Sequence, residues 1–174
     1  GIGSRGTRTR EQDFIEDIYP ATMHNTMLFF TKKGLCYWLK CYEIPEGNKD
    51  SKGRAIQNML NIDPDDQIQS VLRLKGLNDE EFVNNHYVVF CTKSGIVKKT
   101  CLKQYSRPRS NGLIAINLME GDSLVDVRLT NGRNELIIAS RKGRAVRFDE
   151  NDVRTIGRDA IGVRGIRLAD ENDE

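Results

Sequence analysis

The sequence has little of the material that several protein classes require. Its 174 residues include 4 cysteines and 2 histidines, and neither type has the spacing of a disulfide framework or a zinc site. The longest apolar runs, residues 27–30 and 87–91, are far shorter than the roughly 18 to 20 residues that cross a bilayer. Residues 1–10 are polar and basic, unlike a secretory signal. We therefore expect reduced cysteines, no bound metal, no membrane span and a cytoplasmic location.

A catalytic constellation is also missing. Serines are few, both histidines (His24 and His86) stand among turn-forming residues, and no pair of carboxylates lies in an apolar context that would raise a pKa. The glycine-rich stretches at residues 1–6 and 162–165 do not lie between a strand and a helix, so they do not predict a nucleotide site. We expect no catalytic site and no cofactor in this chain.

Charge is nearly balanced in number but unevenly distributed. The 27 basic and 25 acidic residues give a net charge of +2, without the basic excess typical of nucleic-acid-binding domains. Residues 82–119 contain no acid, whereas acids gather at residues 63–66, 79–81 and 170–174. This segregation predicts one positive face and one neutral or acidic face.

One pattern occurs three times along the chain. A hydrophobic strand ends in Thr or Ser, followed by a basic residue, another polar residue and Gly, at residues 28–34, 89–95 and 137–143. A second glycine follows each turn glycine at a similar distance, at Gly53, Gly112 and Gly162. Such self-similarity is typical of a repeat architecture.

Local signals favour strands within each copy. Short β-branched and aromatic runs, glycine at tight turns and only 4 prolines predict about four antiparallel strands per copy, the size of a propeller blade. We place the repeats at approximately residues 11–65, 66–121 and 122–174 of a single all-β domain spanning residues 1–174. Residues 75–85 contain an insertion of about eight residues, which we expect to form a loop or short helical turn.

The basic residue before each turn glycine recurs at equivalent positions, so stacked blades would place these cations on one rim. Such a row suits bent duplex DNA, because neutralised phosphates release condensed counterions. Solvated turns also carry Lys and Arg without binding anything, and this alternative remains open. The candidate DNA-binding residues are Arg5, Arg8, Arg10, Lys32, Lys33, Lys93, Lys98, Lys99, Lys103, Arg141, Lys142 and Arg144.

Several segments resemble the C-terminal domain of DNA gyrase A, and the match covers essentially the whole chain. They are residues 11–17, 28–34, 42–46, 52–55 and 58–60. Because these segments coincide with the threefold repeat, the resemblance is specific. It implies a β-pinwheel, a propeller variant of six blades that exchange strands with their neighbours, of which this chain holds about three.

The resemblance also implies a function. The basic perimeter of the family binds and wraps duplex DNA without sequence specificity, and wrapping gives ATP-dependent negative supercoiling its direction. The DNA-cleaving tyrosine and the ATPase site, which uses ATP and Mg²⁺, belong to other regions of that topoisomerase. The implied partners are double-stranded DNA, the remainder of gyrase A, and gyrase B in an A2B2 assembly.

The start of the chain departs from the family pattern. The diagnostic box reads Gln-Arg-Arg-Gly-Gly-x-Gly, and here Gly1, Ile2 and Gly3 match its last three positions, with Ile2 where a lysine is common. The spacing of the glycine motifs predicts a fragment cut at both ends, which binds duplex weakly and wraps poorly. The alternatives are the related C-terminal domain of topoisomerase IV, or a protein-interaction propeller, which would expose an apolar patch rather than a cationic rim.

Overall fold

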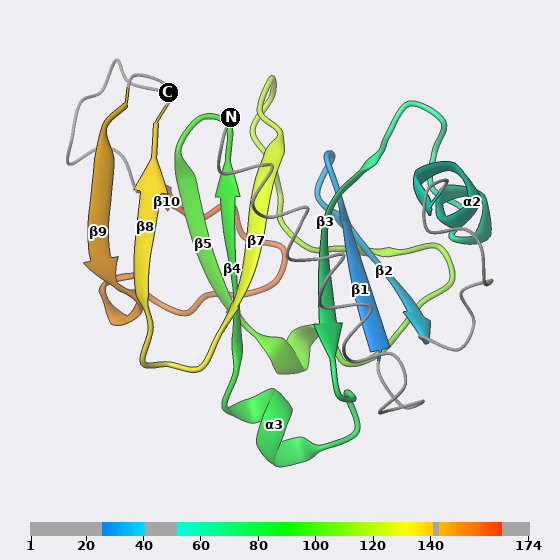
Figure 1. Cartoon of the computed structure of the whole chain (residues 1–174), viewed down its shortest axis with the longest axis horizontal. Helices are drawn as coiled ribbons and strands as arrows, with labels where there is room; N and C mark the ends of the chain where they lie inside the picture. The colour runs from blue at the N-terminus through cyan, green and yellow to red at the C-terminus, as the bar shows by residue number, and fades with distance from the viewer. Residues whose placement is uncertain (1–25, 41–51, 141–142, 165–174) are drawn as a thin grey trace.

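A computed structural model describes residues 26–40, 52–140 and 143–164 of the chain (Figure 1). Its strands form two four-stranded antiparallel sheets and one two-stranded hairpin, which stack side by side from right to left in Figure 1. The prediction of an all-β, blade-like repeat is therefore confirmed. None of the helices in the described residues is long and apolar enough to cross a membrane.

The first blade contains strands from two repeats. Strands β1 (Thr26–Thr31) and β2 (Leu35–Lys40) form a hairpin, β3 (Ile68–Leu74) pairs with β1, and β6 (Leu113–Ile114) pairs with β2. All of these pairs are antiparallel. Because β6 follows the second hairpin in the sequence, the first blade is completed by a strand of the next repeat.

The second blade is built in the same way. Strands β4 (Tyr87–Thr92) and β5 (Ile96–Cys101) form its hairpin, β7 (Leu124–Thr130) pairs with β4, and β10 (Val163–Arg164) pairs with β5. Strand β10 follows the third hairpin, so this blade also takes its last strand from the next repeat. This exchange is the feature that the pinwheel resemblance implied.

The third hairpin consists of β8 (Glu135–Ala139) and β9 (Ala145–Asp149). Its Ile138 is buried together with Val89 and Val153 in a cluster shared with the second blade. Apolar burial of this kind holds neighbouring blades together, because each sheet face must be removed from water.

A larger core fills the space between the first two blades. Phe30 and Phe90 meet edge to face with ring centroids 5.4 Å apart, and Tyr105 packs against both rings. The Tyr105 hydroxyl donates to the carbonyl oxygen of Ala115 at 2.9 Å, so the buried phenol keeps a partner. The described cysteines, Cys36, Cys91 and Cys101, are free thiols.

The repeated turn has a common hydrogen-bond pattern. The hydroxyl oxygens of Thr31, Thr92 and Ser140 each accept from the backbone N–H four residues later, at 3.1, 3.1 and 3.2 Å. Their backbone carbonyls accept from the N–H of the turn glycine. The turn glycines have positive φ angles of 92, 86 and 83° at Gly34, Gly95 and Gly143. The Thr/Ser and Gly of the motif are therefore requirements of the turn.

Short helices connect the strands. The insertion forms α3 (Glu80–Asn84), capped by the Asp79 carboxylate, which accepts from two backbone N–H groups. Of the loop or short helical turn expected here, the structure therefore shows the helical turn. Two 3-10 helices, η2 (Leu102–Tyr105) and η3 (Glu150–Asp152), follow β5 and β9 at equivalent positions.

One helix was not expected from the sequence. Gly53 lies in α2 (Lys52–Met59), whereas its counterparts Gly112 and Gly162 directly precede β6 and β10. In the second and third repeats, the residues after this glycine form a strand that pairs with the preceding blade. Within the described residues, the first repeat has no preceding blade with a sheet edge to pair with. The segment instead packs Ile56 against the free face of the first blade.

We predict that Gly112→Ala destabilises the chain. Gly112 has a φ of 82°, and a Cβ there would lie 2.7 Å from Cζ of Tyr37, so the free energy of unfolding should fall by about 2 kcal/mol or more. Gly76→Ala is the matched control, because nothing lies within 4 Å of its Cβ position. Urea unfolding of both variants measures the effect, and equal stabilities would contradict the prediction.

Candidate nucleic-acid interface

All three hairpin turns lie at the same end of the molecule, the upper end in Figure 1, which we call the hairpin end. The exposed side chains of Lys32, Lys33, Lys93 and Arg144 belong to it. Lys32 and Lys93 stand at equivalent positions, each two residues before its turn glycine. The other residues from the sequence prediction lie outside the described residues: Gly1, Gly3, Arg5, Arg8, Arg10, Arg141 and Lys142.

The hairpin end also carries acids in the first blade. The Lys33 ammonium lies 2.5 Å from a carboxylate oxygen of Asp65, and this hydrogen bond raises the pKa of Lys33. The Asp66 carboxylate accepts from the backbone N–H of Lys33 at 3.1 Å. Lys33 therefore forms an ion pair with an acid at the surface.

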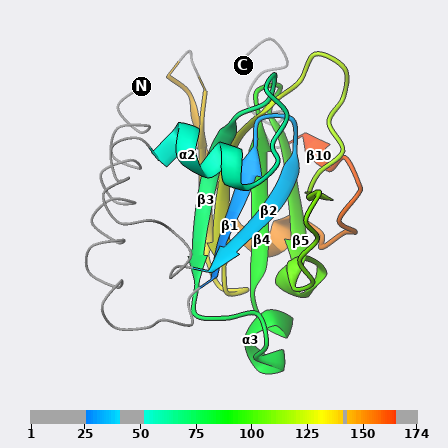
Figure 2. The same cartoon turned by 90° about the vertical axis from the view of Figure 1, so that its right-hand side faces the viewer.

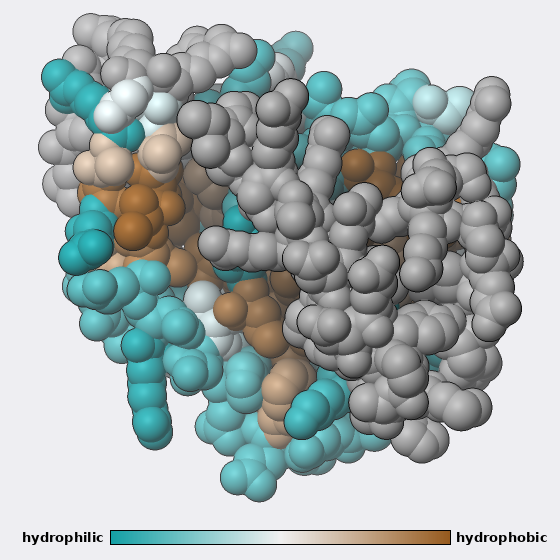
Figure 3. All heavy atoms as spheres, viewed as in Figure 1, coloured by the Kyte–Doolittle hydropathy of each residue, from teal (hydrophilic) through white to brown (hydrophobic). Residues whose placement is uncertain are grey.

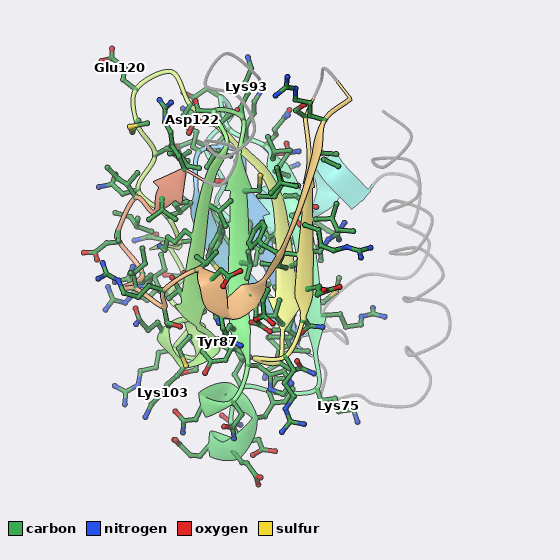
Figure 4. All side chains as sticks on the ribbon, turned by 90° about the vertical axis from the view of Figure 1, so that its left-hand side faces the viewer. Lys75, Tyr87, Lys93, Lys103, Glu120 and Asp122 are labelled. Atoms are coloured by element: carbon green, nitrogen blue, oxygen red, sulfur yellow. The ribbon has the colours of Figure 1, made fainter. Side chains whose placement is uncertain are left out.

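The second blade repeats the contact between a carboxylate and the turn backbone. The Asp122 carboxylate accepts from the backbone N–H groups of Ser94 and Ser123, at 2.9 and 2.8 Å. Figure 4 shows Lys93 at the same end as Glu120 and Asp122. Among the described residues, the hairpin end of the first two blades therefore carries acids beside the cations that the sequence predicted there.

Lys98 was expected to be an exposed cation, but its side chain is fully buried. Its ammonium donates to the carbonyl oxygen of Ala115 at 2.6 Å and to that of Arg158, and it lies 5.3 Å from the centroid of the Phe90 ring. Burial lowers the pKa of Lys98 to about 7. The carbonyl groups that bind this ammonium lie 17 and 60 residues further along the chain, and the Lys-Lys pattern of β5 gives no sign of them.

Lys99 is buried as well, with 3% of its side chain exposed. Its ammonium lies 3.3 Å from a carboxylate oxygen of Glu150 and 4.4 Å from the centroid of the Tyr87 ring. Glu150 also accepts from the Thr130 hydroxyl at 2.6 Å and from the Asn134 N–H at 2.8 Å. Burial opposes ionisation of Glu150, but these hydrogen bonds outweigh it and lower its pKa. Neither Lys98 nor Lys99 presents its charge to a ligand at the surface.

Lys103 lies at the other end of the second blade from Lys93, as Figure 4 shows. Its exposed ammonium is 3.8 Å from a carboxylate oxygen of Glu80 in α3. Lys103 is part of a surface that we call the outer edge, formed by residues 102–119 and 153–164. These segments carry the edge strands β6 and β10, on the side of the blades away from β3 in Figure 2.

The outer edge is strongly basic. Asp159 is its one acid, and its cations are exposed except for half-buried Arg158. Hydrogen bonds join its two segments: Arg158 donates to the carbonyl oxygen of Ile114 and to the Gln104 side chain, both at 2.7 Å. Its basic residues are Lys103, Arg107, Arg109, Arg154, Arg158 and Arg164.

The candidate site predicted from the sequence included Lys103 but none of the five arginines of the outer edge. The acid-free stretch 82–119 contains Arg107 and Arg109, so that signal was available. Arg154 and Arg164 lie in a stretch that also contains acids, and they are recognised only when β10 is placed beside β5.

An apolar patch covers part of β8 and β9, seen at the left of Figure 3. Ile137 is the most exposed large apolar residue there, with 62% of its surface accessible. It stands six residues before its turn glycine, as Val89 does in β4, and Val89 packs against the next repeat. The patch therefore has the position of a blade-stacking face, so it does not favour a protein-interaction propeller.

Comparison with known sequences gives one consistent family. The family model described as the DNA gyrase C-terminal domain, a beta-propeller, matches residues 25–75, 86–131 and 134–174. The chain is 47% identical over 165 residues to the DNA gyrase A protein of Clostridium acetobutylicum, and 44% identical over 173 residues to that of Haemophilus influenzae. These matches cover 95% and 99% of this chain but 19% of each relative, so the chain spans about a fifth of their length.

Solved structures show the same fold. The C-terminal domain of DNA topoisomerase IV superposes with a TM-score of 0.67 at 34% identity, covering 82% of this chain and 43% of that one. A DNA gyrase A C-terminal domain superposes with a TM-score of 0.65 at 23% identity, covering 83% of this chain and 44% of that one. Both are longer than the chain described here.

We predict that Lys99→Met lowers the free energy of unfolding by about 3–5 kcal/mol, because it leaves the buried Glu150 carboxylate without its cation. Lys99→Met combined with Glu150→Gln should recover part of the loss. Lys33→Met is the control: its ion pair with Asp65 is exposed, so stability should hardly change. Urea unfolding measures all three, and a small effect of Lys99→Met would contradict the buried pair.

We also predict a pH dependence from Lys98. The unfolded chain keeps this lysine protonated up to its ordinary pKa of 10.5, whereas the folded chain releases the proton near 7. Between these values the unfolded state binds more protons, so stability rises with pH. Relative to Lys98→Met, the native chain should gain up to about 1.4 kcal/mol per pH unit from pH 7 to 10. A constant difference in urea unfolding across this range would contradict it.

Proposed function

The chain belongs to the DNA gyrase C-terminal domain family, and from this premise we propose that it binds duplex DNA through its outer edge without reading the base sequence. The observation that carries the proposal is the outer edge itself, with six basic side chains and one acid, Asp159. Cations of this kind contact phosphates, which fix the position of a duplex but carry no sequence information.

The outer edge suits a duplex better than the hairpin end does. At the hairpin end a phosphate approaching Lys33 would also approach Asp65, 2.5 Å from that ammonium, and like charges repel. Within the described residues, Arg107, Arg109 and Arg154 have no ion-pair partner. We keep Lys32, Lys93 and Arg144 as flanking contacts at the end of the path, and Arg141 and Lys142 remain candidates from the sequence alone.

We further propose that the module wraps DNA as part of a cytoplasmic gyrase, and so gives direction to ATP-dependent negative supercoiling. Its partners would be duplex DNA, the remainder of gyrase A, and gyrase B, and catalysis would belong to those other regions. Bending 20 to 30 base pairs by 40 to 90° costs on the order of 1 to 6 kcal/mol. Six outer-edge cations offset part of this cost, so we expect this chain alone to bind weakly and bend DNA modestly.

We predict that replacing Lys103, Arg107 and Arg109 with Ser makes duplex binding less dependent on salt. Each lost phosphate contact should reduce the slope of log affinity against log salt by about 0.9. Fluorescence anisotropy with a 30-base-pair duplex across a salt series measures the slope for the native chain and the variant. A slope equal to that of the native chain would place the DNA elsewhere.

The matched control changes Lys32 and Lys93 to Ser at the hairpin end. We expect a smaller change in slope, because carboxylates already lie beside these turns. Two duplexes of unrelated sequence should bind equally, since the contacts are to phosphates. A native chain that fails to bind at low salt would overturn DNA binding by this chain and favour the protein-interaction alternative.

A further inference from the structure

Residues 155–160 form a strap between the first two blades. The Ile156 N–H donates to the carbonyl oxygen of Lys99 in β5 at 2.9 Å, and the Ala160 carbonyl oxygen accepts from the Asn117 N–H at 3.2 Å. The Arg158 guanidinium donates to the carbonyl oxygen of Ile114 in β6. The strap is therefore hydrogen-bonded to the second blade and to the edge strand of the first.

Lys98 lies beneath the strap and joins three segments. Its side chain starts on β5 of the second blade, and its ammonium donates to the carbonyl oxygens of Ala115 and Arg158. Ala115 directly follows β6, which belongs to the first blade, and Arg158 is in the strap. One buried nitrogen thus links the second blade, the first blade's edge and the strap.

The cost of burying this amine indicates that the contact is specific. A buried amine without acceptors is strongly unfavourable, and a buried carbonyl without a donor is costly as well. The charged groups facing Lys98 are Asp159 and Arg158 of the strap, and the Phe90 ring closes the other side. Either protonation state of the amine supplies at least two N–H donors, so the link to both carbonyls survives deprotonation.

We propose that Lys98 is a positioning residue that sets the spacing between the outer edges of the first two blades. This inference rests on the proposed binding of DNA at the outer edge. Arg107 and Arg109 precede β6 of the first blade, whereas Arg154 and Arg164 flank the strap on the second. A duplex that contacts both sets needs them at a fixed separation, and Lys98 holds the segments that carry them.

Two substitutions at Lys98 separate positioning from charge. Lys98→Met keeps an unbranched apolar stem but removes every donor; Lys98→Gln removes the charge but retains two N–H donors. If Lys98 positions the strap, Lys98→Met should weaken binding of a 30-base-pair duplex about five- to tenfold at fixed salt. It should also speed hydrogen exchange of the Ile156 and Asn117 amides.

Lys98→Gln should bind more tightly than Lys98→Met and protect these amides better. If both variants weaken binding equally while exchange stays as in the native chain, Lys98 acts through its charge and the proposal is wrong. Native affinity and exchange in Lys98→Met would also overturn it. Lys75→Met is the matched control, because this exposed lysine lies outside the outer edge, and both readouts should stay native.

Hydrogen exchange keeps this inference separate from the proposed function. If the native chain does not bind duplex at low salt, DNA binding at the outer edge fails, and the positioning role for DNA fails with it. Faster exchange of Ile156 and Asn117 in Lys98→Met would still show that Lys98 holds the strap. Circular dichroism of each variant confirms that it is folded, and Lys98→Gln serves as the test if Lys98→Met unfolds.

Discussion

The structure depends on the exchange of strands between successive repeats. Strands β6 and β10 each contain two residues, and they pair with the first two residues of β2 and β5. An unpaired sheet edge is exposed to water and to other chains, so each blade needs its successor to be complete. Gly162 permits this close approach, because a Cβ there would lie 2.7 Å from the carbonyl oxygen of Val97. The repeats are therefore interdependent.

The same exchange decides which cations reach the surface. The segments that lead into β6 and β10 pack beside β5, so Lys98 and Lys99 are buried and must find partners inside the protein. They do so in the carbonyl oxygens of Ala115 and Arg158 and in the Glu150 carboxylate. The exposed positive charge lies instead on the connecting segments that lead into and out of the exchanged strands. The DNA-binding role proposed for these segments thus depends on the topology as much as on composition.

The parts of the fold that are local in sequence could be predicted from it. The Thr/Ser and Gly of each turn depend on neighbouring residues, and the turns they predicted are confirmed. The insertion, expected as a loop or short helical turn, forms α3. The burial of Lys98 was missed because its partners, Ala115 and Arg158, lie 17 and 60 residues further along the chain. Helix α2 was missed because its segment has the pattern of an exchanged strand but no described sheet edge to pair with. The local sequence pattern indicates which secondary structures a segment can form. Its contacts with distant parts of the chain decide which of them it adopts.

The near-zero net charge of the chain follows from the different uses of its acids and bases. Asp66 and Asp122 accept backbone N–H groups of the hairpin turns, and Asp79 caps α3, so these acids serve local structure. Glu150 balances a buried lysine. Among the contacts of the described residues, basic side chains such as Arg107 and Arg109 have no comparable structural role. Structural acids cancel the cations of the outer edge in the total but lie elsewhere, so a net charge of +2 is compatible with a strongly basic edge of the kind proposed to bind DNA.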